Sequence, residues 1–296
     1  MRFVLAGSSG FLGTALRDRL AREGHEVVRL VRGEAATPAE SRWDPYTGVV
    51  DADLLAAADV VVNLAGAPLV RWPWTASYRQ TILDSRTATT STLANTLAET
   101  GATAALISGS GVDAYGERGD AVLTETSERG STFLADVVRA WEEATDPATE
   151  AGCRVVTLRT GMVLDGSGGA LQLLQIPFRV GVGGRMGSGS RWMSTISRDD
   201  WVSAVVWLAT ATDASGPHNL VAPEPVTSGD FAAIMGRVLN RPAALPVPAA
   251  PARLVLGPMS EVALGSLRVK PAALQAQGFE WEHPDLESIL RHAFGR

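Results

Sequence analysis

Residues 2–13 read RFVLAGSSGFLG, and this stretch decides the fold. A short apolar run, Arg2–Ala6, ends directly in a glycine loop, and an amphipathic stretch, Phe11–Glu23, follows the loop. This order of strand, loop and helix is typical of a dinucleotide-binding βαβ unit. The first glycine permits a tight turn, the second lets the backbone approach a pyrophosphate, and the third lets helix and strand pack closely. The alternative is a turn with a purely structural role.

Free backbone amides at the start of the expected helix would hold the pyrophosphate. We therefore expect the loop and the first turn of the helix to bind a dinucleotide through Gly7, Ser9, Gly10, Phe11, Leu12 and Gly13.

Apolar runs of strand length alternate with segments of helical periodicity in the first half of the chain, which indicates a parallel sheet. After the first strand, four more are expected at Glu26–Val31, Val60–Leu64, Ala104–Ser108 and Arg154–Leu158. The sequence predicts an α/β fold, a Rossmann-type doubly wound parallel sheet with a smaller C-terminal α+β substrate lobe. The nucleotide-binding domain is expected at residues 1–165 with a returning segment at about 192–222, which holds a helix around Trp201–Ala211. Residues 166–191 and 223–296 are assigned to the smaller lobe, and residues 243–252 to an extended connector rich in Ala and Pro.

Composition excludes several classes of protein. A chain of 296 residues with 46% hydrophobic residues can form a sizeable core. The net charge of -6, without blocks of like charge, argues against nucleic acid or an acidic membrane as partner and favours a small-molecule substrate. The single cysteine, Cys153, cannot form an internal disulfide. Neither a signal peptide nor a membrane span is recognisable, so we expect a cytoplasmic protein.

The end of the second strand indicates which dinucleotide is bound. NAD enzymes usually carry an acidic residue there for the ribose hydroxyls, whereas an arginine accommodates the 2′-phosphate of NADP. Arg32 occupies this position, so NADP(H) is the expected cofactor; the alternative is a solvated arginine at a strand end. Leu64, Ala65 and Gly66 follow another strand and should lie beside the adenosine half, although Gly66 could simply form the turn.

The chain resembles the extended short-chain dehydrogenases/reductases, and among them the atypical NAD(P)-dependent epimerase/dehydratase proteins, which are nucleoside-diphosphate-sugar epimerase-like. The resemblance covers nearly the whole chain and rests on the glycine loop, Trp43-Asp44-Pro45, Asn63 to Ala67, Ser85-Arg86, Thr89-Thr90, Ser110 to Gly116, Phe133-Leu134-Ala135, Trp141-Glu142, Arg159, Gly161, Gly168-Gly169-Ala170-Leu171, Arg268-Val269, Pro271 and Gly278-Phe279. It implies that the first lobe binds NADP, that the second closes over a nucleotide sugar or another carbonyl or alcohol, and that relatives form homodimers. It also implies that Arg86 faces the cofactor; the alternative is a surface salt bridge with Asp84 or Glu99.

The usual proton relay of this superfamily is missing from the sequence. Ordinary members use a tyrosine as general acid/base and a lysine four residues later that lowers its pKa. Lys270 is the only lysine, and the positions four residues after the tyrosines Tyr46, Tyr78 and Tyr115 hold Val50, Ile82 and Gly119. The helix expected to carry the pair, Phe133–Glu142, contains neither residue type.

The remaining catalytic candidates follow the strand that ends near Ile107, where a Rossmann sheet presents its reacting groups. Ser110 is expected to orient the substrate oxygen and Tyr115 to donate a proton, with Ser108 beside the cofactor and Asp113 as a weaker acid/base candidate. Alternatively, Tyr115 packs its ring in a turn and the serines satisfy backbone groups.

A glycine-rich loop, residues 183–192, resembles a substrate lid. Arg185 and Arg191 could hold a phosphate or carboxylate and Trp192 could stack on the substrate, unless the loop is simply mobile. Related proteins often have Gln before this tryptophan and His before Asp199-Asp200, where this chain has Arg191 and Arg198, which argues against a standard sugar-nucleotide pocket. The four histidines lack metal-ligand spacing, so no metal is expected.

Two main function hypotheses remain. The first is an NADP-dependent oxidoreductase or epimerase acting on a carbonyl or secondary alcohol. The second is an NADP(H)-binding regulatory or redox-sensing protein without turnover, which the missing Tyr-Lys pair favours. A further, weaker hypothesis is a carbonyl reductase that uses water or the ribose hydroxyl as its proton source.

Overall fold

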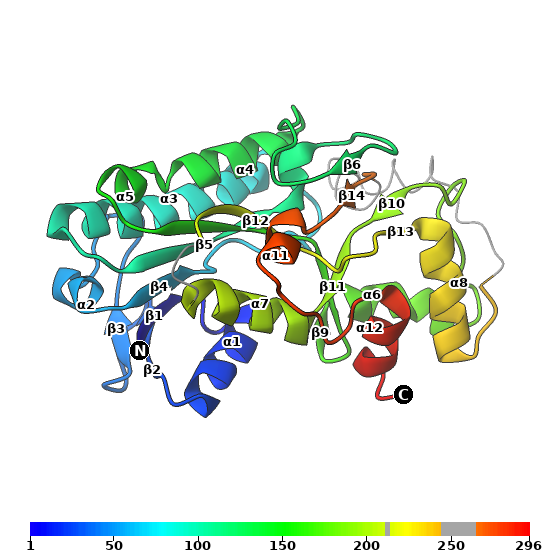
Figure 1. Ribbon diagram of the computed structural model, residues 1–296, viewed down its shortest axis with the longest axis horizontal. Helices are drawn as coiled ribbons and strands as arrows, with labels where there is room; N and C mark the ends of the chain where they lie inside the picture. The colour runs from blue at the N-terminus through cyan, green and yellow to red at the C-terminus, as the bar shows by residue number, and fades with distance from the viewer. Residues whose placement is uncertain (211–213, 244–264) are drawn as a thin grey trace.

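A seven-stranded parallel sheet forms the centre of the molecule (Figure 1). The computed structural model describes residues 1–210, 214–243 and 265–296. The strand order is β12-β7-β5-β4-β1-β2-β3, and every neighbouring pair is parallel. The strands are β1 (Arg2–Ala6), β2 (Glu26–Val31), β3 (Glu40–Arg42), β4 (Val60–Asn63), β5 (Ala105–Gly111), β7 (Val155–Thr160) and β12 (Gly216–Leu220). The predicted Rossmann-type doubly wound sheet is confirmed.

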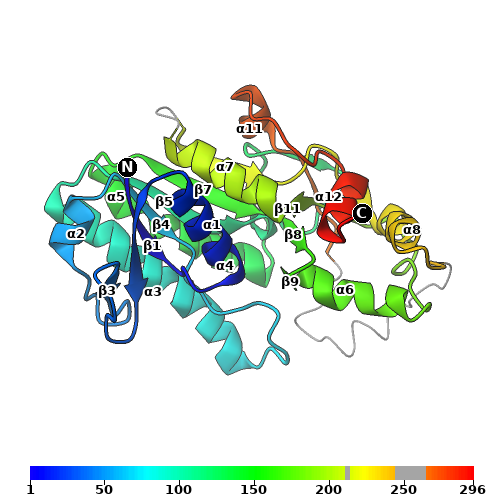
Figure 2. The same cartoon turned by 90° about the horizontal axis from the view of Figure 1, so that it is seen from below.

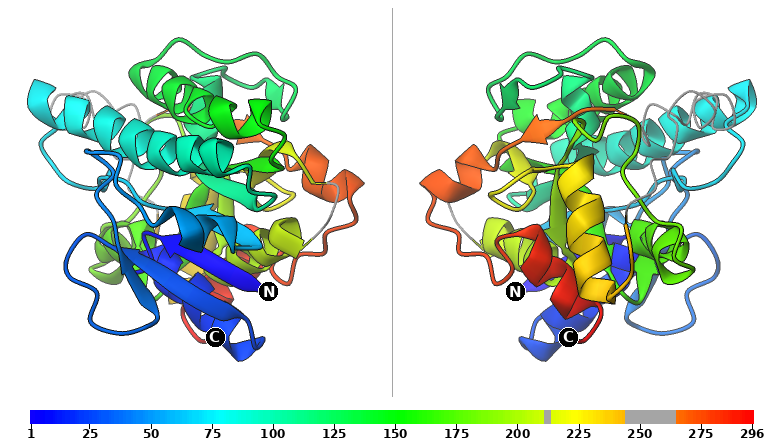
Figure 3. Two further views of the ribbon diagram at one scale, coloured as in Figure 1. Left: turned by 90° about the vertical axis from the view of Figure 1, so that its left-hand side faces the viewer. Right: turned by 90° about the vertical axis from the view of Figure 1, so that its right-hand side faces the viewer.

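Helices cover both faces of this sheet (Figures 1 and 3). One face is covered by α1 (Phe11–Arg22) and α7 (Arg198–Thr210), and the other by α2 (Ala52–Ala56), α3 (Ala76–Thr100), α4 (Phe133–Glu143) and α5 (Asp146–Glu150). Because side chains alternate along a strand, Phe3 and Leu5 of β1 pack in the core beneath α1 and α7, and Val4 and Ala6 pack in the core beneath α2 and α3. A strand buried on both faces must be apolar throughout, which is why β1 is a continuous apolar run.

Strands β5 and β7 extend beyond the expected ends, which were Ser108 and Leu158. The pairing of β5 with β7 continues from Leu106↔Val155 to Gly111↔Thr160, so Ser108 and Ser110 lie within β5 rather than after it. The glycines at 109 and 111 interrupt the apolar pattern, and the end of the strand was therefore placed too early. The polar edge strand β3 was not expected at all, since it carries no apolar residue.

The smaller lobe begins where the main sheet ends (Figure 2). Strand β8 (Met162–Asp165) directly follows β7, so this lobe starts beyond the carboxyl edge of the sheet. Its short strands are β9 (Gly168–Gly169), β11 (Thr195–Ser197), the pair β10 (Trp192–Met193) and β13 (Val226–Thr227), and the pair β6 (Val122–Leu123) and β14 (Arg268–Val269). Its core joins Leu171, Phe231 and Ile289, among others, from α6 (Ala170–Arg179), α8 (Ser228–Leu239) and α12 (Leu286–Ala293).

Residues 223–296 were predicted to lie in the smaller lobe, but part of this segment packs on the main sheet. Helix α11 (Ala272–Ala276) packs on β12, and Leu274 and Phe279 join the core of the main sheet. The proline-rich region after Pro223 also contains α8, which a capping box between Thr227 and Asp230 starts. Apart from Ala243, the expected connector lies outside the described residues. None of the described helices combines the length and the apolarity that crossing a membrane requires.

Candidate functional site

The glycine loop connects β1 to α1 at the carboxyl edge of the sheet, and its three glycines have different tasks. Gly7 has φ +79°, and a Cβ there would lie 2.6 Å from the carbonyl carbon of Leu64. A Cβ on Gly13 would lie 2.1 Å from the carbonyl oxygen of Gly7. A Cβ on exposed Gly10 would meet only that same oxygen, at 3.4 Å. The first and third glycines are therefore required by packing, whereas the second keeps the start of α1 open.

The first turn of α1 suits an anion. Gly10 is the N-cap residue and offers no side-chain acceptor, and the first turn contains no acidic residue. The early amides of a helix have no intrahelical acceptor, and the helix dipole favours negative charge there. These features, with the open surface at Gly10, fit the pyrophosphate of a dinucleotide.

The loop after β4 lies against the glycine loop and is fixed to α3 by buried polar side chains. The Asn63 amide donates to Thr90 Oγ1 (2.9 Å), and its Oδ1 accepts from the Ala65 amide (3.1 Å). Ser85 Oγ accepts from the Ala67 amide at 2.9 Å. The predicted cofactor residues Leu64, Ala65 and Gly66 are thus brought next to Gly7 and held in a defined backbone conformation.

Arg86 of α3 binds the same loop through its guanidinium group. Its guanidinium donates to the carbonyl oxygens of Ala67 and Ile82, both at 3.1 Å, and lies 5.0 Å from the Trp141 ring centroid. Burial lowers the pKa of Arg86 to about 10, although the charge of Asp113 acts in the opposite direction. The alternative of a surface salt bridge does not hold, because Arg86 is only 8% exposed.

Arg32 stands exposed just beyond β2, where the sequence placed the 2′-phosphate contact. Within the ranges 1–210, 214–243 and 265–296, no ion pair or hydrogen bond engages its side chain. Arg29, on the strand itself, is already paired with Glu40 at 2.6 Å. Arg32 is therefore the arginine at this strand end that is available to a ligand phosphate.

The two catalytic candidates are engaged in a buried network rather than directed at an open site. Ser110 Oγ donates to Glu142 Oε1 at 2.6 Å. The Tyr115 hydroxyl, on the 3-10 turn Val112–Tyr115, donates to Asn219 Oδ1 (2.6 Å) and accepts from Arg159 (3.1 Å). Tyr115 is fully buried, and burial raises the pKa of its phenol. This geometry favours the alternative that both hydroxyls stabilise packing. Ser108 is also fully buried within β5, and its Oγ donates a hydrogen bond to the Gly109 carbonyl oxygen at 3.3 Å.

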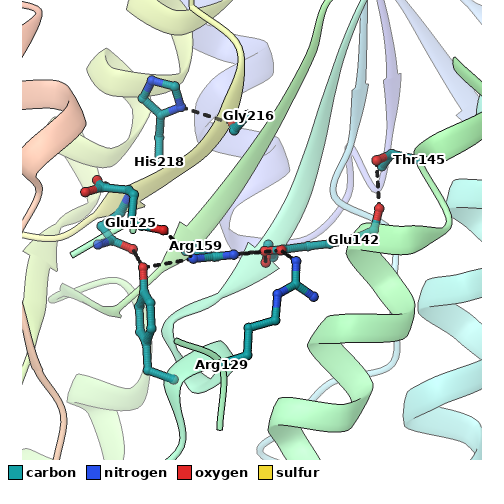
Figure 4. Close-up of polar contacts among 10 residues, drawn as sticks. Glu125, Arg129, Glu142, Thr145, Arg159, Gly216 and His218 are labelled. Atoms are coloured by element: carbon teal, nitrogen blue, oxygen red, sulfur yellow. Dashed lines mark hydrogen bonds and ion pairs between the residues drawn. The ribbon is translucent and has the colours of Figure 1, made fainter. Parts of the chain in front are cut away.

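Glu142 of α4 is the centre of this network (Figure 4). Arg159 of β7 donates to both of its carboxylate oxygens, at 2.9 Å each, and Arg129 donates to Oε2 at 2.5 Å. Burial alone would raise the pKa of Glu142, but the hydrogen bonds and charge of Arg159, with Ser110 and Arg129, bring it below its usual value. From the sequence, Glu142 and Arg159 contribute to the family resemblance without a predicted role. The available signal was a charged residue inside a buried helix and another inside a buried strand.

His218 of β12 is buried near the same network, beside Glu125 (Figure 4). Its Nδ1 lies 3.2 Å from the Gly216 carbonyl oxygen, and its Nε2 lies 2.9 Å from the Gln277 amide nitrogen. A neutral ring protonated at Nδ1 satisfies both contacts. Burial lowers the pKa of this imidazole, although the hydrogen bond to the Gly216 carbonyl and the charge of Glu125 act in the opposite direction.

His218 should make the stability of the protein depend on mildly acidic pH. Its pKa is lower in the folded than in the unfolded chain, so the unfolded chain binds the proton first as pH falls below about 6.5. We expect the free energy of unfolding to decrease from pH 7.5 toward pH 5.5, and this decrease to become smaller in His218→Gln. Urea denaturation at several pH values measures both slopes; identical slopes in the two proteins would contradict the assignment.

The three substrate candidates lie away from the glycine loop, around the smaller lobe. Arg185 is exposed, and Arg191 precedes β10. Trp192 donates from Nε1 to Asp120 Oδ1 (2.8 Å), and the Arg268 guanidinium lies 4.2 Å from its ring centroid. One face and the polar edge of Trp192 are therefore already occupied, which argues against a free stacking platform.

Comparison with known proteins agrees with this geometry. The model of the NAD dependent epimerase/dehydratase family matches residues 3–222, and a domain of unknown function, DUF1731, matches residues 247–293. An epimerase family protein of Mycobacterium bovis is 39% identical over 294 residues, which span 99% of this chain and 97% of the relative. One of Staphylococcus aureus is 32% identical over 302 residues, 98% of this chain and 97% of the relative.

Solved structures show the same fold over the whole chain. Human epimerase family protein SDR39U1 (isoform 2), solved with NADPH, superimposes with a TM-score of 0.89 and 30% identity, covering 100% of both chains. A nucleoside-diphosphate sugar epimerase of Corynebacterium glutamicum gives a TM-score of 0.83 and 38% identity over 100% of this chain and 58% of its own.

Proposed function

The chain belongs to the NAD dependent epimerase/dehydratase family, and on this premise we propose that it is an NADP(H)-dependent oxidoreductase or epimerase that acts on a carbonyl or secondary alcohol. The observation that carries the proposal is the combination of an open helix start at Gly10 with the exposed Arg32 just beyond β2, whose side chain has no ion pair or hydrogen bond among the described residues. The first suits a pyrophosphate and the second a 2′-phosphate. The NADPH in the structure of the human relative supports this choice of cofactor.

The residues of the glycine loop and of the loop after β4 would bind the cofactor. The amides of Phe11, Leu12 and Gly13 would hold the pyrophosphate, and the loop Leu64–Gly66 would flank the adenosine half. The nicotinamide carries the hydride when the cofactor is bound. Ser110 and Tyr115 are engaged with Glu142 and Asn219, so we propose that the proton reaches the substrate oxygen from solvent.

Arg32→Ala should change the preference for cofactor more than the ability to bind one. Loss of a charge-assisted contact to the 2′-phosphate, about 1.5–3 kcal/mol for a hydrogen bond to a charged group, corresponds to roughly a 10- to 150-fold weaker affinity for NADPH. NADH has no 2′-phosphate, so its affinity should change little. Tryptophan fluorescence titrations with both nucleotides measure this; equal weakening of both would contradict a 2′-phosphate role. Arg42→Ala is the matched control, since exposed Arg42 is already paired with Glu34.

The competing function is an NADP(H)-binding protein without turnover. The absence of the Tyr-Lys pair and the engaged hydroxyls of Ser110 and Tyr115 favour it. Both functions require NADPH binding, so turnover separates them. A panel of carbonyl compounds should give a substrate-dependent loss of NADPH absorbance if the protein is a reductase. A panel of nucleotide sugars should give a converted sugar, detected by NMR, if it is an epimerase, because epimerisation is redox-neutral and consumes no NADPH. Saturable binding with neither reaction would favour the regulatory function.

A further inference from the structure

The side chain of Phe11 joins the glycine loop to the smaller lobe. Phe11 is the first residue of α1, and its half-buried ring lies against the backbone of β9. A Cβ on Gly168 would be 2.8 Å from Cδ2 of this ring, and a Cβ on Gly169 would be 3.1 Å from Cε1. A side chain at position 168 would displace the ring, and Gly169 has φ +69°, so both positions favour glycine. In Figures 1 and 2, β9 lies between α1 and the helices α6 and α12.

The turn that contains these glycines is confined from the other side as well. A Cβ on Gly166 would lie 2.0 Å from the carbonyl oxygen of Ala293, at the end of α12. The turn 166–169 is thus packed between Phe11 and the last turn of α12. Helix α6 begins at Ala170, directly after Gly169, which provides no side-chain cap. A displacement of the Phe11 ring would therefore act on the start of α6.

Arg198 reinforces the contact from α7. Its guanidinium lies 5.5 Å from the centroid of the Phe11 ring and donates to Ser167 Oγ at 2.6 Å. It also pairs with Asp165 at 3.2 Å, and Asp165 accepts from the Ser167 amide at 2.7 Å. One arginine thus contacts both the aromatic ring at the glycine loop and the turn that leads into α6.

We propose that Phe11 couples cofactor binding to the position of α6, so that filling the glycine loop orders the substrate lobe. Phe11 is suited to this because its amide belongs to the helix start that would hold the pyrophosphate, while its ring touches the turn 166–169. Fixing the amide restricts the ring, and the close contacts at Gly168 and Gly169 transmit that restriction to Ala170. The inference rests on the proposed NADP(H) binding and assigns Phe11 as a positioning residue. It predicts ordered binding, with the cofactor before the substrate.

Hydrogen exchange followed by mass spectrometry tests the coupling without any substrate. In the wild-type protein, the amides of α6 (residues 170–179) should exchange at least about fivefold more slowly with saturating NADPH than without it. A factor of about five is the lower end of the usual coupling between two sites. Phe11→Ala retains the backbone amide, so it should still bind NADPH. Its affinity should lie within about tenfold of the wild-type value, which corresponds to a loss of less than about 1.4 kcal/mol of binding free energy. It should nevertheless lose the slowing in α6.

Phe133→Ala is the matched control. Phe133 is also the first residue of a helix, half-buried, with an arginine guanidinium 4.0 Å from its ring centroid, but it lies on α4 beside Trp74. It should keep the slowing of exchange in α6. If Phe11→Ala fails to fold, Phe11→Leu serves instead and should reduce the slowing.

Two results would overturn the coupling: bound NADPH that leaves α6 exchange unchanged in the wild type, or full slowing in Phe11→Ala at saturation. Failure of the wild type to bind NADPH is a different result, because it would remove the proposed function and this inference with it.

Discussion

Glu142→Ala is expected to lower the free energy of unfolding by about 3–5 kcal/mol, the usual cost of removing one partner of a buried ion pair. The change would leave the Arg159 guanidinium buried without its carboxylate, since its side chain is only 4% exposed. It would also deprive Arg129 and Ser110 of their acceptor. The loss is larger than that of one hydrogen bond because the uncompensated charge cannot be solvated.

Urea denaturation of Glu142→Ala and Glu143→Ala provides the comparison. Glu143 is the next residue of α4 and is exposed, so its truncation should change the stability by no more than about 0.5 kcal/mol. If Glu142→Ala lost less than about 1 kcal/mol, which is the range of an exposed ion pair, the network would not be the buried charge cluster described above.

Gly10→Ala should weaken NADPH binding while leaving the fold intact. Gly10 has φ -75° and ψ 171°, which alanine adopts readily, and the added Cβ would meet only the Gly7 carbonyl oxygen at 3.4 Å. The same methyl group would occupy the open surface at the start of α1. Overpacking by one methyl group costs about 1–3 kcal/mol, so the affinity should fall roughly 5- to 150-fold with an unchanged melting temperature.

Gly13→Ala separates this effect from damage to the fold. Its Cβ would lie 2.1 Å from the Gly7 carbonyl oxygen, so α1 would have to move away from β1. We therefore expect a lower melting temperature in Gly13→Ala but not in Gly10→Ala, measured by thermal denaturation without nucleotide. Unchanged NADPH affinity in Gly10→Ala would show that the pyrophosphate does not approach this glycine.

The sequence predicts the sheet and the glycine loop well because both depend on local patterns. Apolar runs such as those in β1 and β4 must be buried on both faces, and a glycine at position 13 is imposed by its contact with the Gly7 carbonyl within one βα unit. The bounds of β5 were harder to predict, since its last residues are small and polar. They belong to the strand only because β7 pairs with them up to Thr160.

The buried polar network could not be predicted from the sequence, because its partners lie far apart along the chain. The hydroxyl of Tyr115 meets an amide 104 residues away, at Asn219, and no local pattern encodes that pairing. The same holds for the contact of Phe11 with Gly168, which joins the first helix to the smaller lobe. Local patterns indicate which residues are constrained, whereas the tertiary fold decides which of them meet.

The engaged state of Tyr115 has a consequence for the chemistry. A buried phenol with a raised pKa, hydrogen-bonded to Asn219 and Arg159, is poorly placed to exchange a proton with a ligand. An enzyme with this architecture would rely on orientation of the substrate against the cofactor, which can itself lower a barrier substantially.

The central claim is that the glycine loop binds NADP(H), and a side-by-side titration of the wild-type protein with NADPH and NADH tests it most directly. Quenching of tryptophan fluorescence should saturate with both nucleotides, or with NADPH alone. The affinity for NADPH should be at least about tenfold higher than that for NADH, which corresponds to about 1.4 kcal/mol of binding free energy from the 2′-phosphate. Binding of neither nucleotide, confirmed by calorimetry, would contradict the account and leave the loop as a structural turn.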